Sequence, residues 1–220
     1  MDQEEELKRL KTENELLVMK LRLKEKYIKE LEAELKQRKR LPIHYIKSQT
    51  LADPFVTLKI ETTGLSSDFH DAFQIALVEF KNGQMINQYM KYFRPTRLLT
   101  RKVIQMTGVT NEFLEDKDFI EKEDIEAIRT FIGDKQIVAH AATFSMKFLL
   151  RYFDDFNIDM PEYTVLDTLP LARKLVKDTP NHKFDTLKTY FNLENYESED
   201  ALTDAIVTGQ LALKLNKLKQ

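Results

Sequence analysis

The sequence predicts an α/β fold in which helices flank a mixed sheet, preceded by an N-terminal coiled-coil helix. Residues 1–40 lack Gly and Pro and are rich in Glu, Lys, Leu and Arg, which is typical of a long exposed helix. From Phe55 onward, strand patterns come first and helical patterns then alternate with short apolar runs, which indicates a mixed sheet covered by helices. We expect a coiled coil over 1–40, a linker over 41–54 and a domain over 55–220.

The N-terminal segment has the heptad spacing of a coiled coil. All of its seam positions except Asn14 and Lys24 are apolar. The seam comprises Leu7, Leu10, Asn14, Leu17, Leu21, Lys24, Ile28, Leu31 and Leu35. An Asn at an a position favours a parallel dimer, because other pairings bury its amide without a partner. Antiparallel pairing, pairing with another protein and packing on the chain's own domain remain open alternatives. Pro42 ends this helix and begins the expected linker.

The predicted domain begins with an antiparallel meander of three strands, over Phe55–Ile60, Ala72–Phe80 and Met85–Phe93. Asn82–Gly83 supplies the turn between the last two. Short strands are expected near Gln136–Ala139 and Tyr163–Leu166. The expected helices lie near Leu99–Met106, Ile120–Ile132, Phe144–Phe153, Thr168–Val176, Phe184–Phe191 and Ala201–Lys217.

Composition limits the classes of function. The 34 basic and 36 acidic residues leave a net charge of −2, so binding of nucleic acid must rest on a local patch. The absence of Cys excludes disulfides and thiolate metal sites. No signal-type or membrane-length apolar run is present, so we expect a cytoplasmic protein without membrane contact.

Several motifs resemble the DEDDh 3′-to-5′ exonuclease family, which includes the proofreading epsilon subunit of bacterial DNA polymerase III. The resembling segments are Lys59–Leu65 (KIETTGL), Thr107–Thr110 (TGVT), Val138–Leu149 (VAHAATFSMKFL), Asp167–Arg173 and Ala201–Ala205 (ALTDA). The resemblance implies a ribonuclease H-like fold. It also implies Mg²⁺ or Mn²⁺ chemistry, in which two ions held by carboxylates activate water and stabilise the leaving oxygen.

Transferred to this sequence, the family's catalytic set is incomplete. The first metal-binding Asp falls on Lys59, the middle Asp on Ser145 and the general-base His on Glu199, whereas Glu61 and the last Asp, Asp204, are retained. We therefore expect no intact catalytic site and no cofactor, with Glu61 and Asp204 as residual metal candidates should Mg²⁺ or Mn²⁺ be used. Our hypothesis is that the Lys59 ammonium pairs with Glu61 or Asp204, and the alternative is that it extends into solvent.

The resemblance also implies contacts to a terminal nucleotide by Thr62, Thr63, Gly64, His140 and Phe144. A family Asn after the His is replaced by Ala141.

We expect an inactive or strongly impaired exonuclease-like protein that acts as a binding or regulatory module in DNA replication or repair. One alternative is a divergent metal-dependent 3′-to-5′ exonuclease acting on DNA or RNA. Another is a metal-independent binder of single-stranded nucleic acid. The expected partners are a second copy or another protein through the coiled coil, and single-stranded DNA or RNA.

Overall fold

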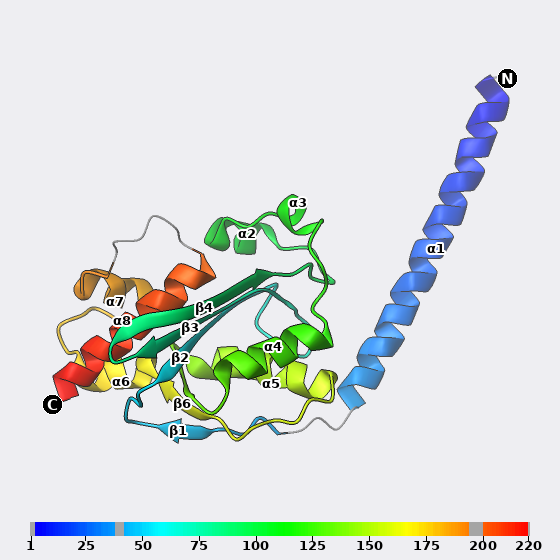
Figure 1. The fold of residues 1–220 in the computed structure, drawn as a ribbon. Helices are drawn as coiled ribbons and strands as arrows, with labels where there is room; N and C mark the ends of the chain where they lie inside the picture. The colour runs from blue at the N-terminus through cyan, green and yellow to red at the C-terminus, as the bar shows by residue number, and fades with distance from the viewer. Residues whose placement is uncertain (1–2, 38–41, 194–199, 220) are drawn as a thin grey trace. The chain divides into compact units, whose positions relative to one another are not determined.

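A computed structural model of the chain describes residues 3–37, 42–193 and 200–219. Two units are separate in their contacts, Met1–Leu41 and Pro42–Gln220 (Figure 1). The first unit holds one helix, α1 (Gln3–Gln37), which begins with the acidic residues Glu4–Glu6, a favourable charge at a helix N-terminus. Apolar side chains along α1 are exposed, from 38% at Leu31 to 61% at Tyr27. The seam residue Leu35 lies outside the described side chains.

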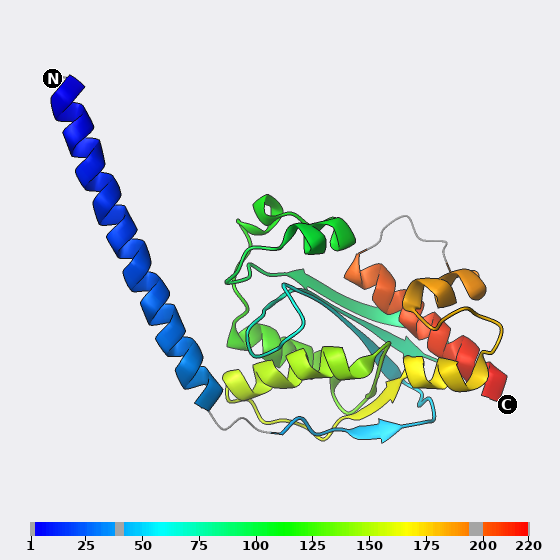
Figure 2. The same ribbon diagram turned by 180° about the vertical axis from the view of Figure 1, so that it is seen from behind.

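The second unit is built on a six-stranded mixed sheet with the order β1-β6-β5-β2-β3-β4 (Figures 1 and 2). The strands are β1 (Ile46–Ser48), β2 (Phe55–Thr62), β3 (Ala72–Lys81), β4 (Gln84–Tyr92), β5 (Gln136–Ala139) and β6 (Thr164–Asp167). Neighbours from β1 to β2 are parallel, whereas β2, β3 and β4 form an antiparallel meander. Asn82 and Gly83 both have positive φ in the β3–β4 turn, as the sequence predicts.

The described part of the chain contains eight helices, counting α1. Those of the second unit are α2 (Arg101–Thr107), α3 (Asn111–Leu114), α4 (Lys122–Ile132), α5 (Ala142–Asp155), α6 (Thr168–Leu175), α7 (Phe184–Tyr190) and α8 (Ala201–Lys219). Some of them begin with side-chain caps. Thr100 caps α2, which is followed by Gly108 with φ 68°, and Glu121 and Asp124 form a capping box on α4. None of the helices in the described ranges combines the length and apolar composition needed to span a membrane.

The two faces of β2 pack against different helices. Val56, Leu58 and Ile60 point into the larger core, which contains buried residues of α4 and α5. The alternate residues of β2, which begin at Phe55, point to the face covered by α8. Helix α8 approaches β3 closely at Gly209, where an added Cβ would collide with the ring of Phe80. This close approach holds α8 against the sheet, over β3 and β2.

The structure differs from the sequence expectations in two short elements. Residues 46–48, inside the expected linker, form the edge strand β1, which pairs in parallel with β6. Helix α3 was not predicted. Both elements are too short to show a periodicity, because β1 has three residues and α3 has four. The remaining predicted strands and helices are found, with ends shifted by one or two residues.

Candidate functional site

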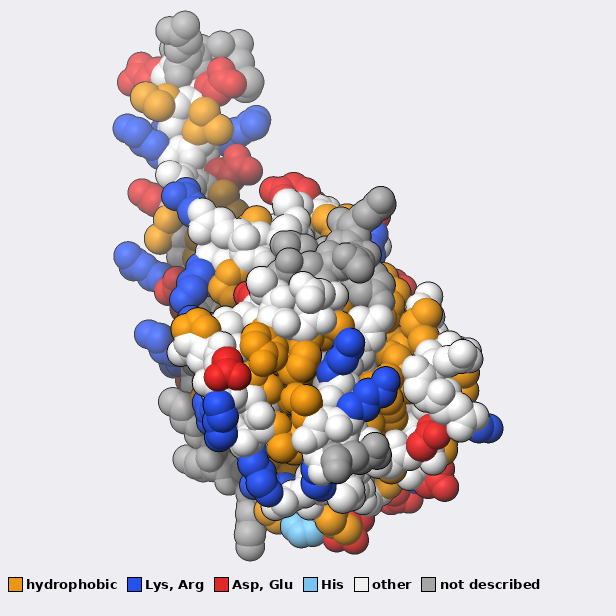
Figure 3. Space-filling model, turned by 90° about the vertical axis from the view of Figure 1, so that its left-hand side faces the viewer, with side chains coloured by type: hydrophobic (Ala, Val, Ile, Leu, Met, Phe, Trp, Pro, Cys, Tyr) orange, Lys and Arg blue, Asp and Glu red, His pale blue; other side chains and the backbone are white. Residues whose placement is uncertain are grey.

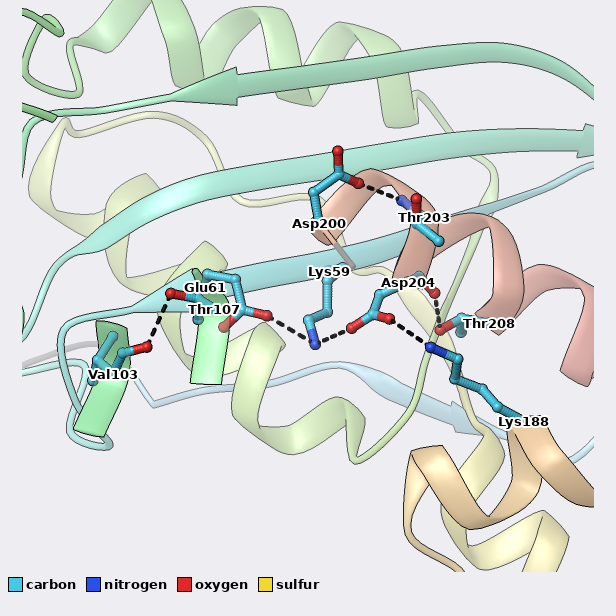
Figure 4. Close-up of polar contacts among 9 residues, drawn as sticks. All are labelled: Lys59, Glu61, Val103, Thr107, Lys188, Asp200, Thr203, Asp204 and Thr208. Carbon is cyan, nitrogen blue, oxygen red and sulfur yellow. Dashed lines mark hydrogen bonds and ion pairs between the residues drawn. The ribbon is translucent and has the colours of Figure 1, made fainter. Parts of the chain in front are cut away.

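Lys59 and Glu61 project from the α8 face of β2, because residues two apart along a strand point to the same side. Asp204 lies in the first turn of α8, above them. The Lys59 Nζ lies 2.9 Å from Glu61 Oε1 and 2.7 Å from Asp204 Oδ2, between the two carboxylates (Figure 4). The hypothesised ion pair of Lys59 is therefore formed with both acids at once.

A second ammonium approaches Asp204 from α7. The Lys188 Nζ lies 3.9 Å from Asp204 Oδ1, an ion pair longer than a hydrogen bond (Figure 4). We call Lys59, Glu61, Lys188 and Asp204 the Lys59 cluster. Its formal charges cancel. Its side chains are only partly exposed, from 16% for Lys188 to 31% for Lys59, so the attraction is screened less than on an open surface.

The ammonium of Lys59 is held in its charged form. Burial by itself lowers the pKa of this lysine, but the charges of Glu61 and Asp204 and their hydrogen bonds outweigh burial and raise the pKa above its ordinary value. Lys59 is therefore a fixed cation at neutral pH. Its ammonium is within hydrogen-bond distance of both retained acids, Glu61 and Asp204.

Local hydrogen bonds fix the first turn of α8. Asp200 Oδ1 accepts the backbone N–H of Thr203 at 2.8 Å, which satisfies a free donor at the start of the helix. The Thr208 hydroxyl donates to the Asp204 carbonyl at 2.7 Å (Figure 4). Asp204 therefore presents its carboxylate from a capped, regular turn of helix.

Aromatic and imidazole rings border the Lys59 cluster. The Lys59 and Lys188 ammoniums lie 5.9 and 5.8 Å from the centre of the Phe184 ring, within cation–π range. His140 follows β5, and its ring centroid is 5.5 Å from that of Phe184. His140 Nδ1 is 2.9 Å from Thr168 Oγ1. Burial lowers the pKa of His140, partly opposed by Asp167, so the imidazole is neutral at pH 7.

The predicted site residues Ser145 and Phe144 lie apart from these contacts. Ser145 is 5% exposed on α5, and within the described ranges no hydrogen bond or ion pair joins it to the Lys59 cluster. Phe144 packs against Phe148 with ring centroids 5.2 Å apart, at the margin of the larger core. Glu199 lies outside the described residues.

Among the predicted nucleotide contacts, Thr62 ends β2, and Thr63 and Gly64 begin the turn that follows it. The Thr62 hydroxyl donates to the Gly64 carbonyl at 2.7 Å, and the Thr63 hydroxyl accepts the backbone N–H of Asp71 at 3.1 Å. An added Cβ at Gly64 would collide with the His70 ring. The turn explains these residue types, and their role in binding a nucleotide stays a prediction.

The residues of the Lys59 cluster do not fit a pair of divalent cations. Lys59 places a positive charge within hydrogen-bond distance of both retained acids, where a metal ion must bind. Across residues 3–37, 42–193 and 200–219, no group of three or more His, Asp or Glu side chains converges as a metal site. We therefore derive no catalytic step through bound metal.

Sequence reasoning missed Lys188 and Phe184 as site residues. The two are four positions apart on α7, so they share one face of that helix. From this spacing alone, Phe184 and Lys188 could have been predicted to lie next to each other. It did not reveal that the face meets Asp204, because that contact depends on how α7 packs against α8.

Comparison with protein families assigns the domain. A family model described as Exonuclease (RNase_T) matches residues 56–212, which is more than half of the chain. The chain belongs to this exonuclease family. The DEDDh resemblance is thereby confirmed at the level of the family.

Curated relatives of this exonuclease-family chain include DNA polymerase III PolC-type proteins. The protein from Halalkalibacterium halodurans is 34% identical over 179 residues, and that from Bacillus subtilis is 33% identical over 180 residues. Each match covers 80% of this chain but 12% of the relative. The chain thus corresponds to a small part of these polymerases.

Solved structures share its fold. Exonuclease X in complex with 5′ overhanging duplex DNA matches with a TM-score of 0.57 and 21% identity, covering 74% of this chain and 91% of that one. E. coli exonuclease I in complex with a dA16 oligonucleotide matches with a TM-score of 0.65 and 18% identity, covering 77% and 42%. The predicted ribonuclease H-like architecture, a mixed sheet with flanking helices, is confirmed.

Proposed function

We propose that this exonuclease-family chain hydrolyses nucleic acid weakly or not at all, and acts as a binding or regulatory module in DNA replication or repair. The observation that carries this proposal is the position of Lys59 Nζ, 2.9 Å from Glu61 and 2.7 Å from Asp204. Two-metal hydrolysis needs cations at these carboxylates to activate water and stabilise the leaving oxygen. A protonated amine carries no water ligand that it could ionise, so it cannot replace them.

Two further substitutions support impaired hydrolysis. Ser145 supplies a neutral hydroxyl where the family has a carboxylate, and Glu199 stands in the place of the general-base His. The carboxylate that Ser145 replaces serves to bind metal, and the His that Glu199 replaces serves to transfer a proton. Restoring any single group should therefore leave hydrolysis far below that of an intact site.

Single-stranded nucleic acid is the proposed ligand of the fold. In support, the structurally similar exonuclease I has been solved with a dA16 oligonucleotide. The ring of Phe184 lies beside the Lys59 cluster. An aromatic ring can stack on a base, and this interaction works without metal.

The test is to incubate the full chain with 5′-labelled single-stranded DNA or RNA and Mn²⁺, and to record both degradation and retained complex. The matched control is the Glu61→Ala/Asp204→Ala variant, which lacks both retained acids. We expect no degradation beyond the control and a complex that survives chelator. Chelator-sensitive degradation that the control lacks would identify a divergent exonuclease instead and overturn the proposal.

We also propose that α1 associates with α1 of a second copy as a parallel coiled coil. In support, the described apolar seam residues are 38–58% exposed. Asn14 at an a position favours the parallel register, because two facing amides can then bond to each other. Pairing with a different protein is the competing outcome. A size measurement on the purified chain distinguishes the two.

A further inference from the structure

A cavity of about 390 Å³ lies at the β1 edge of the sheet, away from the residues of the Lys59 cluster. Side chains of β1, β6, α6 and the end of α8 line it. Its apolar wall includes Val165, Pro170, Leu171 and Leu175. On the face of the domain shown in Figure 3, apolar side chains gather in a patch bordered by Lys and Arg. The apolar wall of the cavity and the lysines that also line it favour a ligand with an apolar part and negative charges around it.

The charges that line the cavity are basic. Lys47, Lys174 and Lys219 contribute to the lining, and within the described part of the chain no ion pair joins Lys47 or Lys174 to a carboxylate. Asp167 is the one acid among the described lining residues. Its carboxylate accepts the backbone N–H groups of Ala141, Ala142 and Leu169. Three lysines and one aspartate give the lining a positive formal charge, which attracts an anionic ligand.

The adjoining strand offers a backbone for pairing. β1 is the terminal strand of the sheet, and Ile46 donates its N–H to the Tyr163 carbonyl of the neighbouring β6. In a parallel ladder the next residue points the other way, so the N–H and C=O of Lys47 face outward from the sheet. Ile46 also leaves 46% of its surface exposed on this edge. An open edge of this kind accepts an extended segment as an added strand.

We propose that the cavity and the β1 edge bind an extended acidic segment of a partner protein, with one apolar side chain of the segment seated in the cavity. Lys47 and Lys174 pair with its carboxylates, and the outward backbone groups of Lys47 pair with its main chain. A nucleic acid strand fits less well. Tyr45 is the one aromatic residue among the described lining residues, and its hydroxyl lies 3.2 Å from Thr143 Oγ1. Single strands instead favour aromatic platforms on which bases stack.

The test is fluorescence anisotropy of a fluorescein-labelled Glu-Leu-Glu-Leu-Glu-Leu peptide titrated with the full chain. We expect saturable binding that weakens as salt is raised. Lys47→Glu/Lys174→Glu should weaken it about tenfold or more, because attraction becomes repulsion. The control Lys81→Glu/Lys102→Glu makes the same change in net charge at two exposed lysines outside the cavity and should bind as the unaltered chain does.

Two control peptides distinguish the contribution of charge to binding from the contribution of the apolar side chain. Lys-Leu-Lys-Leu-Lys-Leu and Glu-Ser-Glu-Ser-Glu-Ser should both bind more weakly than the first peptide. The proposal is overturned if the unaltered chain does not bind the first peptide saturably, if the cavity variant binds it unchanged, or if the lysine peptide binds equally well. It is also overturned if the cavity variant loses binding of a labelled oligo-dT strand but keeps the peptide. None of these substitutions alters the Lys59 cluster. A negative result in the peptide experiment therefore does not affect the test of nuclease activity.

Discussion

Lys59 Nζ donates a 2.7 Å hydrogen bond to Asp204 Oδ2, although the two residues are 145 positions apart in the sequence. The bond joins β2 in the centre of the sheet to the first turn of α8. The same ammonium contacts Glu61, so a single cation holds two acids that would otherwise repel each other. We therefore expect the stability of the fold to depend on Lys59, at a position where the family resemblance implies a metal-binding carboxylate.

Replacing Lys59 by alanine should destabilise the domain. The substitution leaves Glu61 and Asp204 partly shielded from water, with only the longer ion pair between Asp204 and Lys188 remaining. We expect a loss of about 2 kcal/mol in the free energy of unfolding, between the values for exposed and buried ion pairs. Thermal unfolding measures it. Mg²⁺ should recover part of the loss in this variant, because Glu61 then has no ion pair in the cluster and Asp204 keeps only the longer one with Lys188. An unchanged melting temperature would refute the stabilising role.

Lys188→Ala should cost less than Lys59→Ala. Its ammonium lies 3.9 Å from Asp204, beyond hydrogen-bond distance, and contacts one acid where Lys59 contacts two. The same thermal experiment gives the comparison, with exposed Lys81→Ala as the matched control that should not shift the melting temperature. A larger loss for Lys188→Ala would mean that the hydrogen bonds of Lys59 are not the main contribution.

Stability should fall as pH is lowered below about 6.5, the ordinary pKa of histidine. Burial lowers the pKa of His140 in the folded chain, so the unfolded chain takes up a proton there first and is favoured as pH falls. The contribution is fully present above pH 6.5. The free energy of unfolding, measured with urea at about pH 7.5 and pH 5.5, should differ less between the two pH values for His140→Gln than for His44→Gln. The His44 side chain is exposed, so His44→Gln serves as the control. Equal differences would contradict this assignment.

The exposed seam of α1 predicts a dimer whose formation depends on seam residues alone. Leu17→Glu/Leu21→Glu places charge at two seam positions and should give a monomer by light scattering after size exclusion. Leu16→Glu/Leu23→Glu is the matched control, because these leucines are also about half exposed but lie off the seam. The control should remain a dimer. A monomeric unaltered chain would instead favour a different partner for α1.

Most of the fold could be predicted, because its longer elements carry clear periodicities. β2 alternates between its two faces and α4 has a strong apolar side, so both are recognisable locally. β1 could not be predicted, because its three residues become a strand only by pairing with β6, more than a hundred positions later. The pairing of β1 with β6 also forms the open edge of the sheet and part of the wall of the cavity beside it.

The candidate site could be predicted in part. Lys59 and Glu61 share a face by simple alternation, and Asp204 was placed by its motif, so their ion pair was a testable hypothesis. Lys188 and the ring of Phe184 required the packing of α7 on α8, which no local pattern contains. The hydroxyls of Thr62 and Thr63 resembled ligand contacts in sequence, yet each has a hydrogen bond within its own turn.

The most direct test of the account is Mn²⁺ binding measured by isothermal titration calorimetry on the unaltered chain and on Lys59→Asp. If the lysine ammonium occupies the place of the metal, the unaltered chain shows no saturable binding. Lys59→Asp, with three carboxylates facing one another, then gains a Mn²⁺ site that is lost when Glu61→Ala is added. Saturable binding to the unaltered chain that disappears in Glu61→Ala/Asp204→Ala would contradict the account, because the two acids would then hold metal despite Lys59.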